Sequence, residues 1–443
     1  MAEVVPFYGL RYNPKKVGDI SEVIAPPYDV INTNDRTQLQ EQNQYNIVRL
    51  ILNQPSNQDT EANNQYTRAA KQMQLWINDG ILVQDPFPCY YVYDQSFSTP
   101  EGKAYTRRAL IAVGKLEEFK NRVILPHEKT LAAPKLDRLN LMRQTHANLS
   151  PIFLLYSDSE GTIESEMENY TSASPPFIDT PEKFGSTHRM WRIRSDKIKN
   201  RIKAAFISKT LLIADGHHRY ETSLTFRSEV REQVEMESGE WTGTEGHNYV
   251  MMNLVRMESD GLVVLPINRL LHKLNPDLVS EALSRLTDYF EVTEYNSLGQ
   301  LRKNLAKFSE KQPVFGMYTG NKDYRLLVTP PSDSNTPRLD QLDVKILHDK
   351  IISRLFGIDI TIPEDQKKIS YKANTVQAIE MVRSGDYQVA LLMNPTSVDH
   401  VNEVALDGET MPQKSTFFYP KLATGITLNL LNNPILSGTC HED

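Results

Sequence analysis

The stretch IADGHHRY, residues 213–220, joins the end of a strand, a turn and the start of a helix. Residues 210–214 are apolar and predict a buried strand, whereas residues 217–230 have a helical composition. Gly216 can adopt a positive φ, and the first N–H groups of the following helix have no partner within that helix. The sequence therefore predicts a strand-to-helix turn that suits an anion such as phosphate.

The polar side chains of this turn predict its chemistry. Arg219 can contact two phosphate oxygens at once, and together with Gly216 it is expected to bind the phosphates of a cofactor. Asp215, His217 and His218 are the candidate catalytic residues, and Asp215 is also the candidate ligand for Mg²⁺. The alternative is a helix cap at Asp215 with surface histidines. Zinc at the two histidines is disfavoured because neighbouring helix residues face different ways.

A second cluster of charge lies upstream, in the motif LPHEKT at residues 125–130 and the KLDR run that follows it. The spacing is not HExxH, which disfavours a zinc protease. Glu128 is a candidate general base, and Lys135 and Arg138 are candidate cations for a polyphosphate. A solvated helix face with ordinary ion pairs is the alternative.

The third motif is MPQKSTFFYPK, residues 411–421. Lys414, Ser415 and Thr416 lie outside any Gly-rich Walker frame, so the motif is not a P-loop. Proline, aromatic residues and lysines in a nonperiodic run favour a fixed loop that lines a cleft, and we predict that these three residues contact the cofactor. Simple packing is the alternative.

The length of 443 residues predicts at least two domains. Helical and extended patterns alternate along the chain, which predicts a mixed α/β architecture. We place the boundary near Asn268. Residues 1–267 would form a domain with APPYDV (residues 25–30), LPHEKT and DGHHR, and residues 268–443 a C-terminal α/β domain with MPQKST.

Composition excludes several classes of protein. The net charge of -7, with both signs interspersed, argues against a nucleic-acid binder. Two cysteines support neither a disulfide framework nor a thiolate metal cage, which favours a reducing compartment. With no signal peptide and no apolar run of about 18 residues, we expect a cytoplasmic protein without membrane contact that acts on a small molecule. A homo-oligomer is compatible with this expectation.

The motifs APPYDV, LPHEKT, KLDR, IADGHHRY and MPQKSTFFYPK together resemble the prokaryotic family known as domain of unknown function 1015, over nearly the whole chain. Asn268 departs from this pattern, which has histidine there. The DGHHR turn also resembles that of the ParB and sulfiredoxin superfamily, which includes free-serine kinases and nucleotide-hydrolysing partition proteins. This resemblance implies a ParB/sulfiredoxin-like core with large insertions, and a turn beside the nucleotide phosphates.

The turn and the resemblance together predict a Mg²⁺-dependent phosphotransferase. Its phosphate donor would be a nucleotide (ATP or ADP) or pyrophosphate, and its acceptor a small hydroxyl compound, with free L-serine favoured. Glu22, Asp29 and Glu128 are the candidate bases. A non-catalytic nucleotide sensor and a phosphoester hydrolase are the alternatives.

Overall fold

The computed structural model describes residues 1–443 except 131, 238, 310–311, 321–322, 332–336 and 434–443. It divides into two compact units. Unit 1 comprises residues 1–126, 130–262 and the chain from Pro420 onward; unit 2 comprises residues 127–129 and 263–419. The chain therefore enters unit 2 briefly within LPHEKT and returns to unit 1 after Tyr419, in contrast to a single division at Asn268. Both units combine helices with a sheet, which confirms the mixed α/β class.

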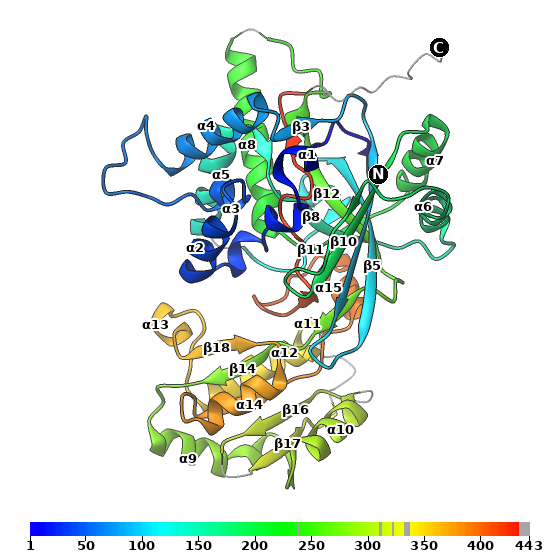
Figure 1. Ribbon diagram of the computed structural model, residues 1–443. Helices are drawn as coiled ribbons and strands as arrows, with labels where there is room; N and C mark the ends of the chain where they lie inside the picture. Colours follow the sequence, from blue (N-terminus) through cyan, green and yellow to red (C-terminus); the bar gives the residue numbers. More distant parts are fainter. Residues whose placement is uncertain (131, 238, 310–311, 321–322, 332–336, 434–443) are drawn as a thin grey trace. The chain divides into compact units, whose positions relative to one another are not determined.

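Unit 1 is built on a nine-stranded, mostly antiparallel sheet (Figure 1). Its path is β6 Ile124–Leu125, β11 Leu211–Asp215, β8 Ile152–Tyr156, β12 Tyr249–Arg256, β5 Ala104–Lys115, β4 Tyr90–Ser98, β10 Ser186–Ile193 and β9 Ile178–Asp179, with β1 Val4–Val5 beside β5. Among the strands that the structure describes in this sheet, the β6–β11 and β8–β12 pairs are parallel and the others antiparallel. Shorter pairs join β2 Leu10–Tyr12 to β3 Leu82–Gln84, and β7 Ala147–Asn148 to β21 Asn429–Leu430.

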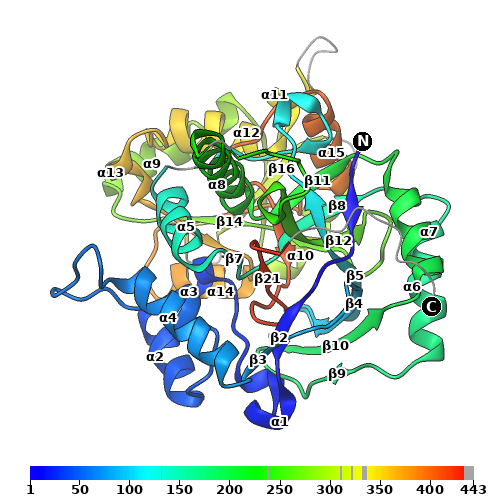
Figure 2. The same ribbon diagram turned by 90° about the horizontal axis from the view of Figure 1, so that it is seen from above.

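The two faces of this sheet differ in character, because successive side chains of a strand point to opposite faces. One face is the apolar core, with Leu110, Leu154 and Leu254, and it is covered by α6 Thr162–Ala173 and α7 Asp196–Phe206 (Figures 1 and 2). The alternate positions put buried Arg107 and Asn253 on the other face. Most other positions on this second face are apolar, as at Ile111 and Phe153, so Arg107 and Asn253 are isolated buried polar groups within it.

The remaining helices of unit 1 are α1 Pro14–Val17, α2 Thr33–Gln42, α3 Val48–Ile51, α4 Gln65–Asn78, α5 Ala132–Thr145 and α8 His217–Met236, with 3-10 turns at Ile20–Glu22, Tyr28–Val30, Phe119–Asn121 and Gly246–Asn248. α4 packs on α5 and α5 on α8. Leu139 and Met142 of α5 meet Phe226 of α8 in a small apolar cluster. This packing brings the KLDR run on α5 beside the helix that follows DGHHR.

Unit 2 has a six-stranded sheet in the order β15 Glu291–Tyr295, β17 Tyr324–Val328, β16 Val314–Tyr318, β19 Val389–Leu392, β14 Asn268–Leu271 and β18 Ile369–Lys372. Its helices are α9 Pro276–Ser284, α10 Leu298–Ser309, α11 Arg338–Gln341, α12 Asp343–Ile346, α13 Pro363–Gln366, α14 Thr375–Arg383 and α15 Val398–Leu406, with a 3-10 turn at Leu286–Asp288. α12 continues as a π-helix, η6 Leu347–Leu355. β13 Val263–Leu265 pairs with β20 Phe417–Tyr419.

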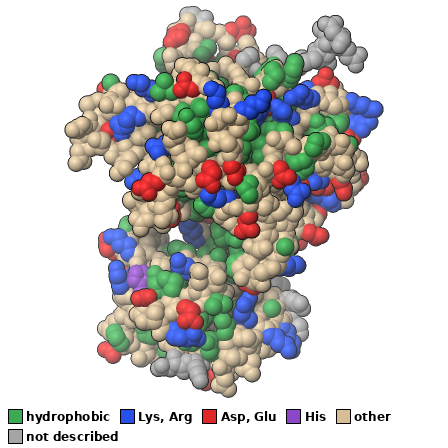
Figure 3. All heavy atoms as spheres, in the orientation of Figure 1, with side chains coloured by type: hydrophobic (Ala, Val, Ile, Leu, Met, Phe, Trp, Pro, Cys, Tyr) green, Lys and Arg blue, Asp and Glu red, His purple; other side chains and the backbone are tan. Residues whose placement is uncertain are grey.

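The surface shown in Figure 3 has Lys and Arg side chains interspersed with Asp and Glu. This mixture matches the composition, in which acidic and basic residues are both frequent. None of the described helices has the length and apolarity that crossing a bilayer requires.

Candidate functional site

The predicted strand-to-helix turn is present in unit 1, with one feature that the sequence did not predict. β11 ends at Asp215, Gly216 has a φ of 98°, and α8 begins at His217. The ladder with β8 pairs Ile213 with Leu154 and Asp215 with Phe153, so that Ala214 is an extra, bulged residue. Because a shift by one residue reverses the face of a side chain, the bulge moves Asp215 from the face covered by α6 and α7 to the face that carries Arg107 and Asn253.

Asp215 lies between two cations. Its Oδ2 accepts a hydrogen bond from Nη2 of Arg219 at 2.8 Å, and its Oδ1 accepts one from Nζ of Lys421. Burial raises the pKa of Asp215, but the charges of Lys421 and Arg219 outweigh burial and hold the pKa at about 2. Burial lowers the pKa of Lys421, and the carboxylates of Asp215 and Asp29 raise it by more. The pair is therefore charged at neutral pH, and Asp215 is a poor proton acceptor.

Arg219 folds back over the turn instead of extending into solvent. Its Nη1 donates to the carbonyl of Pro151, and a Cβ built on Gly216 would lie only 2.9 Å from its Nη2. The missing side chain at Gly216 thus leaves the room that the guanidinium occupies. His217, in the first turn of α8, is buried, and its charge also lowers the pKa of Asp215, whereas His218 is half-buried.

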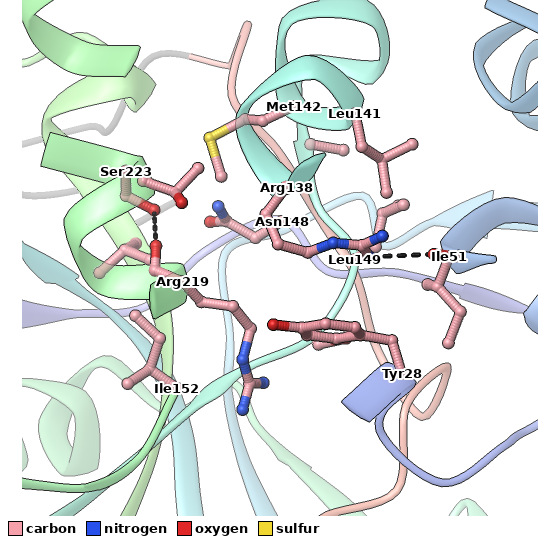
Figure 4. Close-up of a pocket in the computed structure, with 14 residues that line it drawn as sticks. Tyr28, Ile51, Arg138, Leu141, Met142, Asn148, Leu149, Ile152, Arg219 and Ser223 are labelled. Atoms are coloured by element: carbon pink, nitrogen blue, oxygen red, sulfur yellow. Dashed lines mark hydrogen bonds between the residues drawn. The ribbon is translucent and has the colours of Figure 1, made fainter. Parts of the chain in front are cut away.

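A pocket beside the turn brings three sequence motifs together (Figure 4). Tyr28 comes from APPYDV, Arg138 from KLDR and Arg219 from DGHHR, and all three line it. The guanidinium of Arg138 lies 4.2 Å from the centre of the Tyr28 ring, and its Nη1 donates to the carbonyl of Ile51 at 2.9 Å. Burial raises the pKa of Tyr28, and the charges of Arg219 and Arg138 oppose that rise. The phenol therefore lies within the field of both cations.

The rest of this pocket is neutral. It holds about 470 Å³ of empty space, counting the part open to solvent. Its other lining residues are Ile51, Leu141, Met142, Ala147, Asn148, Leu149, Ser150, Ile152, Thr222, Ser223 and Val250. No Asp, Glu or His side chain is among them. Both guanidinium groups are ion-paired with carboxylates that lie outside this lining, Arg219 with Asp215 and Arg138 with Asp137, so the charged groups of the lining itself are the two guanidinium groups.

Lys135 of α5, which was predicted to contact the cofactor, forms an ion pair with a residue of α8. Its ammonium lies 2.6 Å from Glu221 of α8, and the hydroxyl of Thr130 donates to the same carboxylate at 2.8 Å. The ion pair links α5 to α8, and the Thr130 bond links the segment before α5 to the same helix. Lys135 is not among the residues that line the pocket. A phosphate contact by Lys135 stays a prediction.

The remaining predicted residues come together in unit 2, where LPHEKT meets MPQKST. His127 Nε2 is 2.9 Å from the hydroxyl of Thr416, and the N–H of Lys414 donates to Glu128 at 3.3 Å. Ser415 is buried, and its hydroxyl donates to the carbonyl of Pro412. Glu128 and the Lys414–Thr416 run therefore form one cluster, while their cofactor and catalytic roles stay predictions.

Three further residues of unit 1 position the site: Arg107, Gln95 and Lys421. The sequence did not predict them as site residues. Arg107 is 1% exposed, and its Nη2 donates to Gln95 at 2.6 Å and to the carbonyl of Pro420 at 2.7 Å. Gln95 in turn donates to the carbonyl of Lys421 at 3.3 Å. These bonds place Lys421 against Asp215. For Arg107, the local signal was the basic pair Arg107–Arg108 directly before the apolar run at residues 109–113.

The structure offers little support for a metal at Asp215. Each carboxylate oxygen already binds a cationic side chain, so a divalent ion would have to displace Arg219 or Lys421. Within the described residues, His, Cys, Asp and Glu form no group of three or more that could hold a metal ion. The side chains around Asp215 therefore do not fit Mg²⁺.

Among solved structures, a free serine kinase mutant in complex with AMP matches with 13% identity and a TM-score of 0.36, covering 72% of this chain and 92% of that one. A conserved hypothetical protein from Pyrococcus furiosus matches with 13% identity and a TM-score of 0.34, covering 72% and 95%. SbnI from Staphylococcus aureus, truncated at its C-terminus, matches with 10% identity and a TM-score of 0.33, covering 72% and 87%. Because identities and TM-scores are this low, no activity is transferred from these proteins.

No curated protein matches the chain. The sequence pattern of one family, described as "Protein of unknown function (DUF1015)", matches residues 4–345. This match covers most of the chain and includes the APPYDV, LPHEKT and DGHHR motifs of both units. The chain therefore belongs to the DUF1015 family, as its motifs predicted.

Proposed function

We propose that the turn at Asp215–Arg219 and the pocket beside it bind the phosphates of a nucleotide or of pyrophosphate, and that the protein transfers a phosphoryl group to a small hydroxyl compound. Free L-serine is the acceptor we favour. The observation that carries this proposal is the pocket lined by Arg138, Arg219 and Tyr28 without a carboxylate. Guanidinium groups beside the start of a helix are suited to bind phosphate oxygens.

Phosphoryl transfer requires chiefly positioning and charge stabilisation from the protein. In the proposed reaction the acceptor hydroxyl oxygen forms a bond to phosphorus, and the bond from phosphorus to the leaving phosphate oxygen breaks. Arg138 and Arg219 would neutralise the transferred group, and His217 and His218 would donate to it from the first turn of α8. The hydroxyl proton passes to a carboxylate.

Asp215 is not suited to accept this proton, because its pKa of about 2 makes its carboxylate a weak acceptor. In unit 1, Asp29 is the better candidate, because its charge reaches Lys421 and it follows Tyr28 directly. Glu22 lies 2.8 Å from Lys183 and is already paired. Glu128 belongs to unit 2, and its role as a base stays a prediction. In this scheme Asp215 orients Arg219 and Lys421.

A non-catalytic nucleotide sensor is the second candidate. It is favoured by the absence of any Asp, Glu or His among the pocket's lining residues, since a binding pocket needs no proton acceptor. The sensor and the enzyme share the phosphate contacts and differ only in turnover. A phosphoester hydrolase would release phosphate without requiring an acceptor.

Calorimetry with ATP, ADP and pyrophosphate tests the binding site. Loss of one charge-assisted contact costs about 1.5–3 kcal/mol, so Arg219→Ala should weaken affinity by roughly ten-fold to more than a hundred-fold. Arg143→Ala is the matched control, because Arg143 also lies beside α8 but pairs at the surface with Glu229 at 2.6 Å. Equal affinities of the two variants would overturn the phosphate site.

The reaction is tested by incubating the protein with each donor and a panel of hydroxy amino acids. Phosphoserine formation that requires Arg219 supports the kinase. Nucleotide binding without any product supports the sensor, and phosphate release without an acceptor supports the hydrolase.

A further inference from the structure

Unit 2 has a pocket of its own, and its described lining residues all belong to that unit. It holds about 1840 Å³ of empty space, counting the part open to solvent. Its walls come from the end of α10 and the loop before β16, from the loop after β17, from the start of α12, and from the loop and helix that follow β19. Segments from much of the unit 2 sequence therefore surround one space.

Part of this lining is apolar and preformed. Val344 of α12 and Val404 of α15 line the pocket, and each is 2% exposed. Pro313, Pro331 and Pro395 line it from three different loops. Because the proline ring fixes φ, these wall positions lose little conformational freedom when a ligand binds. The pocket can therefore cover the apolar part of a small molecule.

Asp343 places a carboxylate in the same lining. It is the first residue of α12 and is half-buried. Within the described residues its carboxylate has neither a hydrogen bond nor an ion pair. Burial raises the pKa of Asp343 from 3.8 to about 6, and the charge of His400 opposes that rise. The charged form still predominates at neutral pH, without the contacts that normally compensate a carboxylate for burial.

The other charged or titratable residues of the described lining are His400 and Glu403, both on α15. Glu403 already has an interaction of its own, so Asp343 is the carboxylate available to a ligand. No Lys or Arg is among the described lining residues, so a ligand has to supply the full positive charge. A metal ion does not fit, because the described His, Cys, Asp and Glu residues form no group of three or more that could hold one.

Water offers a simpler explanation. The N-terminus of a helix stabilises a carboxylate in its first turn, and solvent can hydrate Asp343 through the open side of the pocket. Water gains little from the valine and proline walls, however, because they offer it few hydrogen-bond partners. A molecule with an apolar body and an ammonium group would cover these walls and pair with the carboxylate.

We propose that unit 2 binds a small organic amine in this pocket, with the ammonium group on Asp343 and the apolar body against Val344, Val404 and the three prolines. The site goes beyond the proposed phosphoryl transfer and does not depend on it, because its described lining contains no residue of unit 1.

The test uses n-butylamine, which is an ammonium ion at neutral pH, and 1-butanol, a neutral molecule of similar length, on the full chain. With ¹³C-labelled valine methyl groups, the resonances of Val344 and Val404 should shift with butylammonium. They should stay in place with butanol at equal concentration and with NaCl at equal ionic strength. Val92, buried in the core of unit 1, is the internal reference and should not shift with any of them.

Asp343→Asn removes the charge and keeps the size of the side chain, so the affinity for butylammonium should fall at least about ten-fold. Asp399→Asn is the matched control and should keep the affinity, because Asp399 is exposed in the first turn of α15 and does not line the pocket. The melting temperature of Asp343→Asn without amine should not fall, since the change removes an unpaired carboxylate.

Three results would overturn the amine site. Equal shifts with butylammonium and butanol would show an apolar pocket that does not recognise charge. Equal affinities of the two aspartate variants would show that the amine binds elsewhere on the acidic surface. Shifts with Mg²⁺ but none with butylammonium, or no shift at all, would leave Asp343 to a metal or to water. The comparison of the two probes on the unmodified chain decides the question even if Asp343→Asn fails to fold.

Discussion

The guanidinium of Arg219 occupies the space that a side chain at Gly216 would need: a Cβ there would lie 2.9 Å from Nη2 and 3.1 Å from Cζ. Gly216 also has a φ of 98°, which side chains disfavour. The glycine therefore serves the site in two separate ways. It makes the turn between β11 and α8, and it lets Arg219 reach Asp215.

Gly216→Ala should both destabilise the protein and weaken phosphate binding. The strained φ costs about 1–2 kcal/mol, and the clash displaces Arg219 from Asp215. Thermal unfolding and calorimetry with pyrophosphate measure the two effects. Gly102→Ala is the control, because Gly102 has a φ of 85° but nothing within 4 Å of its would-be Cβ. It should lose stability and keep its affinity; equal affinities would show that the Arg219 contact does not matter.

Asp215→Asn should make stability less sensitive to acid. The folded-state pKa of about 2 lies below the ordinary value of 3.8, so the charged carboxylate stabilises the fold above pH 4. That contribution is lost as the pH falls through 4 towards 2, and it amounts to about 2 kcal/mol.

Urea unfolding between pH 2 and pH 7 measures this effect. At neutral pH the variant should be less stable by about 2 kcal/mol or more, because Arg219 and Lys421 lose their buried counter-charge. Asp59→Asn removes the carboxylate that pairs with Arg68 at 2.6 Å near the surface, and it should change stability by less than Asp215→Asn does. Equal pH profiles for the Asp215 variant and the unmodified chain would contradict the assigned ion pairs.

Arg107→Lys should loosen the chain segment that carries Lys421. Lysine cannot donate to Gln95 and to the carbonyl of Pro420 with the same planar fork, nor cover the Phe153 ring, whose centre lies 4.8 Å from Cζ of Arg107. Amide hydrogen exchange at residues 421–428 should accelerate. The control is Arg108→Lys, which breaks a two-bond pair with Asp94 at 2.7 and 2.8 Å. Faster exchange in both variants would mean general destabilisation.

His188 should make the fold sensitive to mild acid. Burial, followed by the charge of Arg107, lowers its pKa from 6.5 to about 4. The unfolded chain therefore binds the proton more readily between these values, and stability falls as the pH drops from about 6.5 to 4, by about 3 kcal/mol. His188→Asn should flatten this part of the profile. An unchanged slope in the variant would assign the acid sensitivity to other groups.

The sequence predicted those elements that are determined by residues close together in the chain. An apolar run before Asp215, a glycine and a helical stretch after it lie within a few residues of one another, and they were sufficient for the turn. The mixed α/β class followed from alternating periodicities for the same reason. The family followed from motifs that can be read without a structure.

Only the tertiary structure decided how these motifs act. The bulge at Ala214 depends on the register with β8, and that register sets the face on which Asp215 lies. The approach of Lys421 to Asp215 joins residues 206 positions apart, and no local pattern encodes it. Both outcomes arise from packing against distant strands, because backbone pairing and burial select among conformations that the local sequence permits equally.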